Sequence, residues 1–318
     1  MRDTILFGDC RDTLKQFDEK ARMCVTSPPY YGLRDYGGEE SQIGQEQSPE
    51  EFIDELVKVF REVRNVLTDD GTCWVNLGDS YYNYRKDGCI PKQTFASNRQ
   101  DLPVTTPRRS NKLKGYKEKD LIGIPWMFAF AMRADGWHLR QDIIWHKPNP
   151  MPESVRDRCT KAHEYIFLFS KQKNYFYDNE AIKEPAKDWG TRDRTNGKYH
   201  NEGTGLQPHS GLTKSYEKKN KRSVWTVNKK PYKGAHFATY PPELIEPCIK
   251  AGSEVGDIVL DPFMGSGTTA AVAKSLGRDY IGCELHEDYG NLIKKRVSEY
   301  SPVVEVTQSP LLDALNKV

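Results

Sequence analysis

A buried strand, a glycine turn and a helix start follow one another at residues 257–269, and this succession constrains the fold more than any other feature. The sequence there reads D-I-V-L-D-P-F-M-G-S-G-T-T. The apolar run at 258–260 predicts a short buried strand, and Gly265 and Gly267 let the backbone turn sharply and come close to a ligand. A helix beginning at Thr268 offers its free N–H groups at the same point. The pattern indicates an α/β fold with a ligand at the carboxyl end of this strand.

The turn differs from two common phosphate-binding sequences. Ala270 stands where the dinucleotide fingerprint has its third glycine, a position that sometimes accepts alanine, and no Gly-Lys-Ser/Thr of a Walker loop follows. Asp261, at the tip of the strand, would repel a pyrophosphate but suits a cofactor with an amine. Glu284 ends the next predicted strand, where such folds bind ribose hydroxyls. The residues favour S-adenosylmethionine, which has an ammonium group and a ribose but no phosphate; the alternative is a glycine turn of another nucleotide-binding domain.

The remaining periodicity agrees with an α/β domain. The sequence Ser48-Pro49-Glu50-Glu51 predicts a capped helix with one apolar face, and the turn at Asp70-Gly71 then leads into a buried strand at 73–77. Further strands are predicted at 4–7, 23–26, 139–145, 164–169 and 280–283, and further helices at 124–134, 242–250, 268–276 and 288–300. We predict one domain over residues 1–318, with a mixed, mainly parallel twisted sheet covered by helices on both faces.

Basic charge is concentrated in two polar stretches, although the chain has a formal net charge of only +2. Residues 85–119 hold 10 Lys/Arg and 3 Asp/Glu, and residues 183–233 hold 13 and 5. We interpret residues 81–119 as a basic inserted loop and residues 183–233 as a second insertion. Such a distribution is typical of a surface that contacts a phosphate backbone. Two solvated loops would give the same charge pattern.

Several other classes of protein are disfavoured. The seven cysteines are scattered and never spaced as C-x-x-C, which argues against a disulfide framework and against a zinc ribbon. We expect no bound metal. No apolar run has the length needed to span a bilayer, and the N-terminus lacks a signal-peptide pattern. A reducing, cytoplasmic setting is the expectation.

The tetrapeptide Ser27-Pro28-Pro29-Tyr30 follows the strand predicted at 23–26. Each proline lacks an N–H and fixes φ, so the chain must leave the sheet at Ser27 in a stiff, extended turn. Such a turn can direct the Ser27 hydroxyl, a proline carbonyl and the Tyr30 ring at one point. Two acceptors beside an aromatic ring can hold a flat base that carries an exocyclic amine. An ordinary loop after a strand is the alternative.

Taken together, the two motifs resemble those of the DNA amino-methyltransferases, which methylate cytosine N4 or adenine N6. That family has an Asp/Asn/Ser-Pro-Pro-Tyr/Phe tetrapeptide and a D-P-F-x-G-S-G-T turn, and this chain has both in the order of the circularly permuted β group. Three shorter blocks also match the family: Gly8-Asp9-Cys10, residues 236–241 and Glu284-Leu285. The resemblance implies a Rossmann-like, S-adenosylmethionine-dependent methyltransferase fold with circularly permuted motif order.

The resemblance also implies a set of cofactor-binding residues. They are Asp9, Phe237, Asp261, Phe263, Gly265, Ser266, Gly267, Thr268 and Glu284. The glycine turn is expected to wrap the methionine part, Glu284 to hold the ribose, Asp9 to lie near the adenine, and Phe237 to close over the methionine end. Two of these residues have simpler interpretations, because Asp9 could be only a strand-end cap and Phe237 only a core residue.

For catalysis, the predicted residues are Ser27, Pro28, Pro29 and Tyr30. The exocyclic amine is a poor nucleophile, and Ser27 Oγ with the Pro28 carbonyl can accept its hydrogen bonds while the amine lies in line with the sulfonium methyl group. Tyr30 is expected to stack on the base, which must be flipped out of a duplex. Serine at the first motif position resembles the cytosine-N4 branch, so we predict cytosine N4, with adenine N6 as the alternative.

The expected substrate is double-stranded DNA. Residues 183–233 are predicted to recognise the target sequence, and residues 85–119 to help clamp the duplex; His146 and residues 148–152 are candidates for the border of the base pocket. A cognate restriction endonuclease is a candidate partner, and the protein is expected to be a monomer or a homodimer. Two alternatives stay open: an inactive or regulatory DNA-binding module with a methyltransferase fold, and methylation of RNA or of a protein glutamine.

Overall fold

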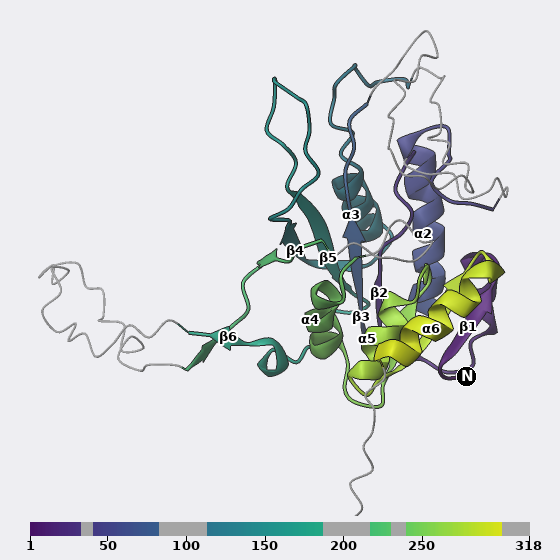
Figure 1. Ribbon diagram of the computed structural model, residues 1–318. Coiled ribbons are helices and arrows are strands. Elements are labelled where there is room, and N and C mark those ends of the chain that lie inside the picture. The colour runs from purple at the N-terminus through teal and green to yellow at the C-terminus, as the bar shows by residue number, and fades with distance from the viewer. Residues whose placement is uncertain (33–40, 83–112, 187–216, 230–239, 301–318) are drawn as a thin grey trace, which may run out of the picture.

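An eight-stranded mixed sheet forms the centre of the protein (Figure 1), seen in a computed structural model that describes residues 1–32, 41–82, 113–186, 217–229 and 240–300. In sheet order the strands are β1 (Thr4–Phe7), β10 (Asp279–Glu284), β9 (Ile258–Asp261), β2 (Ala21–Thr26), β3 (Leu67–Leu77), β5 (His163–Ser170), β4 (His138–His146) and β8 (Val224–Thr226). All neighbours are parallel except β5, which is antiparallel to β3 and to β4. The predicted mixed, mainly parallel sheet is confirmed.

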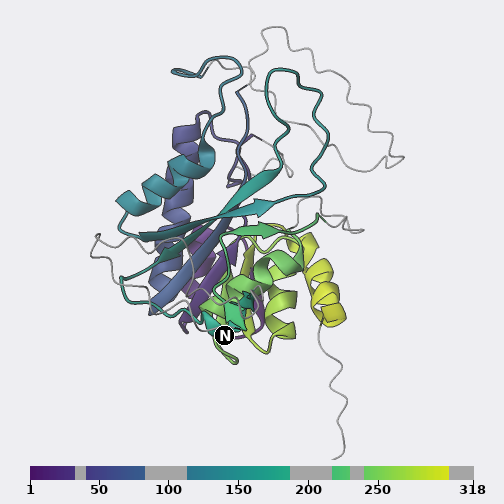
Figure 2. The same cartoon turned by 90° about the vertical axis from the view of Figure 1, so that its left-hand side faces the viewer.

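Helices cover both faces of the sheet (Figure 2). On one face lie α2 (Pro49–Val66) and α3 (Ile124–Ala134), with the short α1 (Cys10–Thr13) and η1 (Leu14–Gln16) beside them. On the other lie α4 (Pro242–Gly252), α5 (Thr268–Ser275) and α6 (Gly290–Tyr300). Two further 3₁₀ turns are η2 (Glu180–Ile182) and η4 (Glu287–Tyr289). None of the helices in the described ranges is long and apolar enough to cross a membrane.

Helix α2 shows how local sequence sets these elements. The Ser48 side chain accepts a hydrogen bond from the Glu51 N–H at 3.2 Å, and Pro49 occupies the first helical position. Phe52 and Leu56 are among the fully buried side chains of the apolar face. Each such side chain contributes about 1.5–3 kcal/mol by leaving water, so the packed face stabilises the helix more than its cap does.

Two segments differ from the prediction. Strand β3 begins at Leu67, and the predicted turn at Asp70-Gly71 lies inside it, where the register with β2 shifts between Ala21 and Met23. A bulge of this kind has the same Asp-Gly signature as a turn, so the sequence pattern did not distinguish them.

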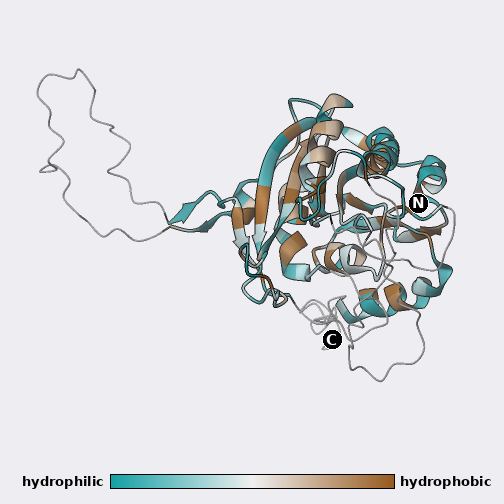
Figure 3. Ribbon diagram, turned by 90° about the horizontal axis from the view of Figure 1, so that it is seen from above, coloured by the Kyte–Doolittle hydropathy of each residue, from teal (hydrophilic) through white to brown (hydrophobic). Residues whose placement is uncertain are grey.

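The second difference concerns residues 183–233, which the prediction treated as one insertion. Residues 224–226 form the edge strand β8, which pairs in parallel with β4, and Trp225 is buried. A strand of three residues is too short for periodicity to reveal. The hairpin of β6 (Glu184–Pro185) and β7 (Lys218–Lys219) stands away from the body of the protein and is hydrophilic (Figures 1 and 3).

Candidate site residues gather at one edge of the sheet, which we call the carboxyl edge. It holds the carboxyl ends of β1, β10, β9, β2, β3 and β4, and the amino end of the antiparallel β5. Strands β9 and β2 are neighbours there, with Cys24 opposite Leu260, although they lie far apart in the chain. In open α/β sheets this edge is where ligands bind.

Candidate active site

The turns that follow β2 and β9 are joined by a direct hydrogen bond. Thr26, the last residue of β2, donates its hydroxyl hydrogen to Asp261 Oδ1 at 2.6 Å. Ser27 follows Thr26, and the glycine turn follows Asp261. The Ser-Pro-Pro-Tyr turn and the glycine turn therefore begin side by side at the carboxyl edge.

Asp261 is enclosed by protein donors. Its carboxylate accepts hydrogen bonds from the hydroxyls of Thr26, Thr269 and Tyr240 and from the Phe263 N–H, and the residue is only 1% exposed. Burial raises the pKa of Asp261, and the hydroxyl and N–H donors oppose that shift. These bonds brace β9 against β2 and α5. The predicted role of Asp261 toward a cofactor amine stays a prediction.

Glu284 closes the other side of the glycine turn. One carboxylate oxygen accepts from the Gly265 N–H at 2.7 Å, and the other accepts from the His286 N–H at 3.1 Å. Gly265 has a φ of 54°, a conformation that favours glycine. Burial raises the pKa of Glu284, with the two N–H donors opposing the shift. A carboxylate has about four acceptor positions, so these two bonds leave room for ribose hydroxyls.

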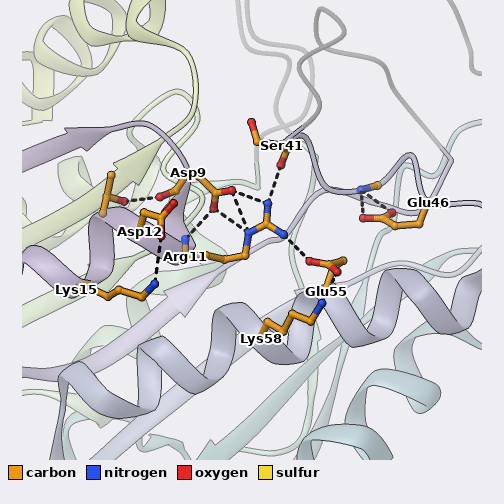
Figure 4. Close-up of polar contacts among 10 residues, drawn as sticks. Asp9, Arg11, Asp12, Lys15, Ser41, Glu46, Glu55 and Lys58 are labelled. Atoms are coloured by element: carbon orange, nitrogen blue, oxygen red, sulfur yellow. Dashed lines mark hydrogen bonds and ion pairs between the residues drawn. The ribbon is translucent and has the colours of Figure 1, made fainter.

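Asp9 caps α1 and pairs with Arg11 (Figure 4). It accepts from the Arg11 N–H at 2.8 Å and from the Arg11 guanidinium, which also binds Glu55 on α2. Burial raises the pKa of Asp9, but the hydrogen bonds and charge of Arg11 outweigh it and hold the pKa below its ordinary value. The capping role is confirmed. Asp9 also lies close to Glu284, because the Gly8 N–H donates to the Glu284 carbonyl at 2.9 Å; its contact with adenine stays a prediction.

The remaining residues of the glycine turn differ in their burial and in their contacts. A Cβ on Gly267 would lie 2.9 Å from Ile293 Cγ2, so glycine is needed for α6 to pack here. The Ser266 hydroxyl accepts from Arg296 on α6 and is buried, as is Thr268 at the start of α5. Phe263 is partly exposed. The predicted Phe237 lies outside the described residues.

A cavity of about 230 Å³ opens beside Tyr30. For scale, a cavity of roughly 150 Å³ admits a benzene ring. Its lining comes from the turns after β2 and β3, the start of α3, the β4–β5 connection and the segment after β8: Tyr30, Tyr31, Gly78, Asp79, Ser80, Ile124, Lys147, Met151, Glu153, Lys161, His163, Glu164 and Lys229. The cavity therefore has room for one flat ring against the Ser-Pro-Pro-Tyr turn.

Tyr30 is held in a defined position. Its hydroxyl donates to Glu164 Oε2 at 2.9 Å and lies 3.3 Å from Asn76 Oδ1. Burial raises the pKa of Tyr30, and the Glu164 carboxylate raises it further. The ring lies so close to Gly78 that a Cβ there would be 2.6 Å from Tyr30 Cε2. The absence of a side chain at residue 78 thus sets where the ring can lie.

Sequence reasoning missed the Lys147–Glu164 ion pair in this cavity. Lys147 Nζ donates to Glu164 Oε1 and lies 4.1 Å from the centre of the Trp145 ring. Burial lowers the pKa of Lys147, and the Glu164 carboxylate opposes that shift. Glu164 reaches the carboxyl edge only because β5 is antiparallel, which its own sequence does not reveal. Lys147 stands directly before the proline-rich residues 148–152, a sequence context that gives no sign of its burial.

The predicted pocket border is only partly reproduced. Met151, within residues 148–152, lines the cavity. His146 is not part of the lining and instead lies 3.2 Å from the Thr226 hydroxyl on β8.

Comparison with known proteins identifies the family. A family model described as DNA methylase, of the N6/N4 type, matches residues 21–295. The chain belongs to the DNA amino-methyltransferase family. It is therefore a DNA methyltransferase, in agreement with the resemblance carried by the two motifs.

Whole-length relatives exist among the type II methyltransferases. The chain is 46% identical to M.XycI of Xanthomonas campestris pv. cyanopsidis over 93% of this chain and 88% of that protein. It is 46% identical to M.SmaI of Serratia marcescens, with 92% and 90% covered. The likeness to M.Cfr9I of Citrobacter freundii is 44%, with 92% and 87% covered.

Solved structures agree with the fold of this DNA amino-methyltransferase. The DNA modification methylase TTHA0409 of Thermus thermophilus, solved with S-adenosyl-L-methionine, has a TM-score of 0.58 at 25% identity and covers 94% of both chains. The cytosine-N4-specific PvuII methyltransferase has a TM-score of 0.60 at 19% identity, and the match covers 93% of this chain and 86% of that one. At this identity the likeness is evidence for the fold and not for the activity. The predicted Rossmann-like methyltransferase fold is confirmed.

Proposed function

We propose that this DNA methyltransferase transfers a methyl group from S-adenosylmethionine to N4 of a cytosine flipped out of double-stranded DNA. The observation that carries the proposal is the Thr26–Asp261 hydrogen bond, which places the Ser-Pro-Pro-Tyr turn directly beside the glycine turn. One turn can then hold the reacting amine while the other holds the methyl donor.

The carboxyl edge suits a cationic cofactor without phosphate. Asp9, Glu284 and Asp261 stand at the ends of three adjacent strands, β1, β10 and β9. Asp9 is paired with Arg11 and Asp261 is enclosed by protein donors, yet the carboxylates together still make this edge unfavourable for a pyrophosphate and suited to a ligand with an ammonium and a sulfonium group. Glu284 would hold the ribose, and the backbone of residues 263–268 the methionine part. When bound, S-adenosylmethionine supplies the electrophilic methyl group.

The cavity beside Tyr30 would receive the flipped base. Ser27 Oγ and the Pro28 carbonyl accept hydrogen bonds from the exocyclic amine and orient its lone pair toward the methyl group. The Tyr30 ring, fixed by Glu164 and Gly78, stacks on the base. Because these groups are held before the base arrives, little ordering is needed when it binds.

We propose cytosine rather than adenine as the target base because serine at position 27 resembles the cytosine-N4 branch of the family. The rest of the tetrapeptide serves either amine equally well. Adenine N6 is therefore the alternative product.

We further propose a restriction–modification role, because the relatives are named type II methyltransferases. A cognate endonuclease would be the partner. Residues 183–233 remain the proposed target-recognition region, and residues 85–119 the segment proposed to help clamp the duplex. The described part of the first region carries Lys218, Lys219, Lys221 and Arg222 in or beside the projecting β6–β7 hairpin, which suits contact with phosphates.

The test is methyl transfer by the purified protein. Tritiated S-adenosylmethionine is supplied with duplex DNA, RNA or a mixture of proteins, and the labelled nucleosides are identified after digestion. Label in duplex DNA as N4-methylcytosine is the expected result, whereas transfer to RNA or protein would contradict the proposal. Failure to bind S-adenosylmethionine by calorimetry would instead support an inactive DNA-binding module.

A further inference from the structure

Lys147 has donor capacity that its protein partner does not use. An ammonium group has three N–H donors. Within the described part of the chain, the hydrogen-bond acceptor of Lys147 Nζ is the Glu164 carboxylate, while its other near contact is the face of the Trp145 ring. Lys147 is 6% exposed and lines the cavity beside Tyr30. An ammonium buried in this way is stabilised when further acceptors enter the cavity.

The position of Lys147 matches one side of a base held by the Ser-Pro-Pro-Tyr turn. Lys147 follows β4, and Tyr30 follows β2, with β3 and β5 between these strands at the same carboxyl edge. Glu164 links the two residues, because it accepts from the Tyr30 hydroxyl with one oxygen and from Lys147 with the other. A base can therefore stack on the Tyr30 ring with its exocyclic amine toward Ser27. The edge of the base next to that amine then faces Lys147.

We propose that Lys147 is the specificity-determining residue that reads the ring edge of the flipped base, donating hydrogen bonds to N3 and O2 of cytosine. This inference rests on the proposed function and deepens it. Cytosine presents two adjacent acceptors beside its amine, N3 and O2, and two free N–H donors of one ammonium can bind both. On its Watson–Crick edge adenine presents one acceptor beside its amine, N1, followed by C2–H, which accepts nothing; its N7 acceptor lies on the opposite side of the amine. Lys147 thus favours cytosine at the point where the tetrapeptide alone does not discriminate.

Glu164 acts as a positioning residue. Its bond to Lys147 directs the ammonium, and its bond to the Tyr30 hydroxyl fixes the ring on which the base stacks. The Asn76 side-chain amide, 3.4 Å from the same Glu164 oxygen, further restrains the carboxylate. The carboxylate also offsets the ammonium charge, so that neither group is buried unpaired.

The experiment is a double-mutant cycle in which one change is made in the enzyme and the other in the substrate base. Duplexes carry the methylated site found by sequencing, with either cytosine or 3-deazacytosine, which has C–H in place of N3, at the target position. The variants are Glu164→Gln and the double variant Lys147→Met/Glu164→Gln, which differ only at residue 147. The wild type and the double variant leave no buried charge unpaired, whereas Glu164→Gln leaves the Lys147 ammonium without its carboxylate, so the double variant is compared with the wild type as well. The 3-deaza change alters the amine itself, but that effect is common to all variants and cancels in the comparison.

Loss of the Lys147 hydrogen bonds should lower kcat/KM for the cytosine duplex by about 10- to 100-fold relative to Glu164→Gln. In each variant we then measure how much kcat/KM falls when 3-deazacytosine replaces cytosine. This fall, called the 3-deaza penalty, should be about 10- to 100-fold smaller in the double variant than in Glu164→Gln, because the donor that binds N3 is missing. Calorimetric titration with S-adenosylmethionine, which binds at β9 and β10, checks that each variant is folded. Lys250→Met removes a half-buried charge on α4 that pairs with Glu246 and does not line the cavity, and it should leave kcat/KM for both duplexes unchanged.

The outcomes separate the two proposals. If the wild type makes N4-methylcytosine but the 3-deaza penalty is equal in both variants, the role of Lys147 is overturned and the proposed function still holds. N6-methyladenine as the wild-type product overturns both. A penalty that shrinks only when Lys147 is absent supports the inference.

Discussion

Replacing Gly78 by alanine adds a single methyl group, which the structure predicts will displace the Tyr30 ring. The new Cβ would lie 2.6 Å from Tyr30 Cε2 and 3.3 Å from Cδ2 and Cζ. Carbon atoms in good contact lie about 3.5–4.0 Å apart, so ring or backbone must move by about 1 Å. Overpacking of this kind costs about 1–3 kcal/mol, and a displaced ring also weakens the 2.9 Å bond from its hydroxyl to Glu164.

Two measurements follow for Gly78→Ala. Urea denaturation should show a free energy of unfolding lower by about 1–3 kcal/mol. The methyl-transfer rate should fall by up to about 100-fold, because a misplacement of 1 Å in a reacting complex can have that effect. Affinity for S-adenosylmethionine should stay near the wild-type value, since Gly78 lies after β3 and the proposed cofactor residues lie after β1, β9 and β10.

The matched control removes the ring instead. In a Tyr30→Ala background the methyl group at residue 78 has no ring to meet, so Gly78→Ala should there cost less than about 0.5 kcal/mol. If Gly78→Ala destabilises the protein equally with and without the Tyr30 ring, the clash is not the cause and the reasoning is refuted.

Three further predictions concern single residues. Ser27→Ala should lower turnover by at least about 100-fold with little change in cofactor affinity by calorimetry; loss of both would mean that Ser27 also supports the cofactor site. Glu284→Gln should weaken S-adenosylmethionine binding by about 10- to 100-fold in the same titration, and an unchanged affinity would remove Glu284 from the ribose site. Asp9→Asn keeps a capping oxygen but loses the charge pair with Arg11, so it should lower the free energy of unfolding by about 1 kcal/mol near neutral pH. Because the folded-state pKa of Asp9 is depressed, the wild type should lose this advantage as pH falls below the ordinary value of 3.8 and through the depressed pKa. An advantage that persists at all pH values would contradict the assigned pair.

The elements with strong local signals were predictable. Helix α3 follows the predicted bounds 124–134, because Pro125 near its start and Gly136 after its end mark it in sequence. Strand β1 also matches its predicted range of 4–7. Cys24 and Cys73 lie in apolar runs of the sequence and are fully buried, which is common for free cysteines.

The parts that depend on tertiary pairing were not predictable. Strand β8 exists because β4 offers it an edge, and three residues leave no periodic pattern. The sequence alone suggests that Asp261 is a free carboxylate at the end of a strand. In the structure, three hydroxyls from separate segments donate hydrogen bonds to it. Glu164 and Lys147 meet because an antiparallel strand lies beside a parallel one, a juxtaposition that neither local sequence encodes.

Methylation-aware sequencing of DNA from cells that express this protein yields both the modified base and its sequence motif in one measurement. We expect N4-methylcytosine at a single recurring motif, and its disappearance when Ser27 is replaced by alanine. N6-methyladenine at the motif, or N4-methylcytosine that persists in the Ser27→Ala variant, would contradict it.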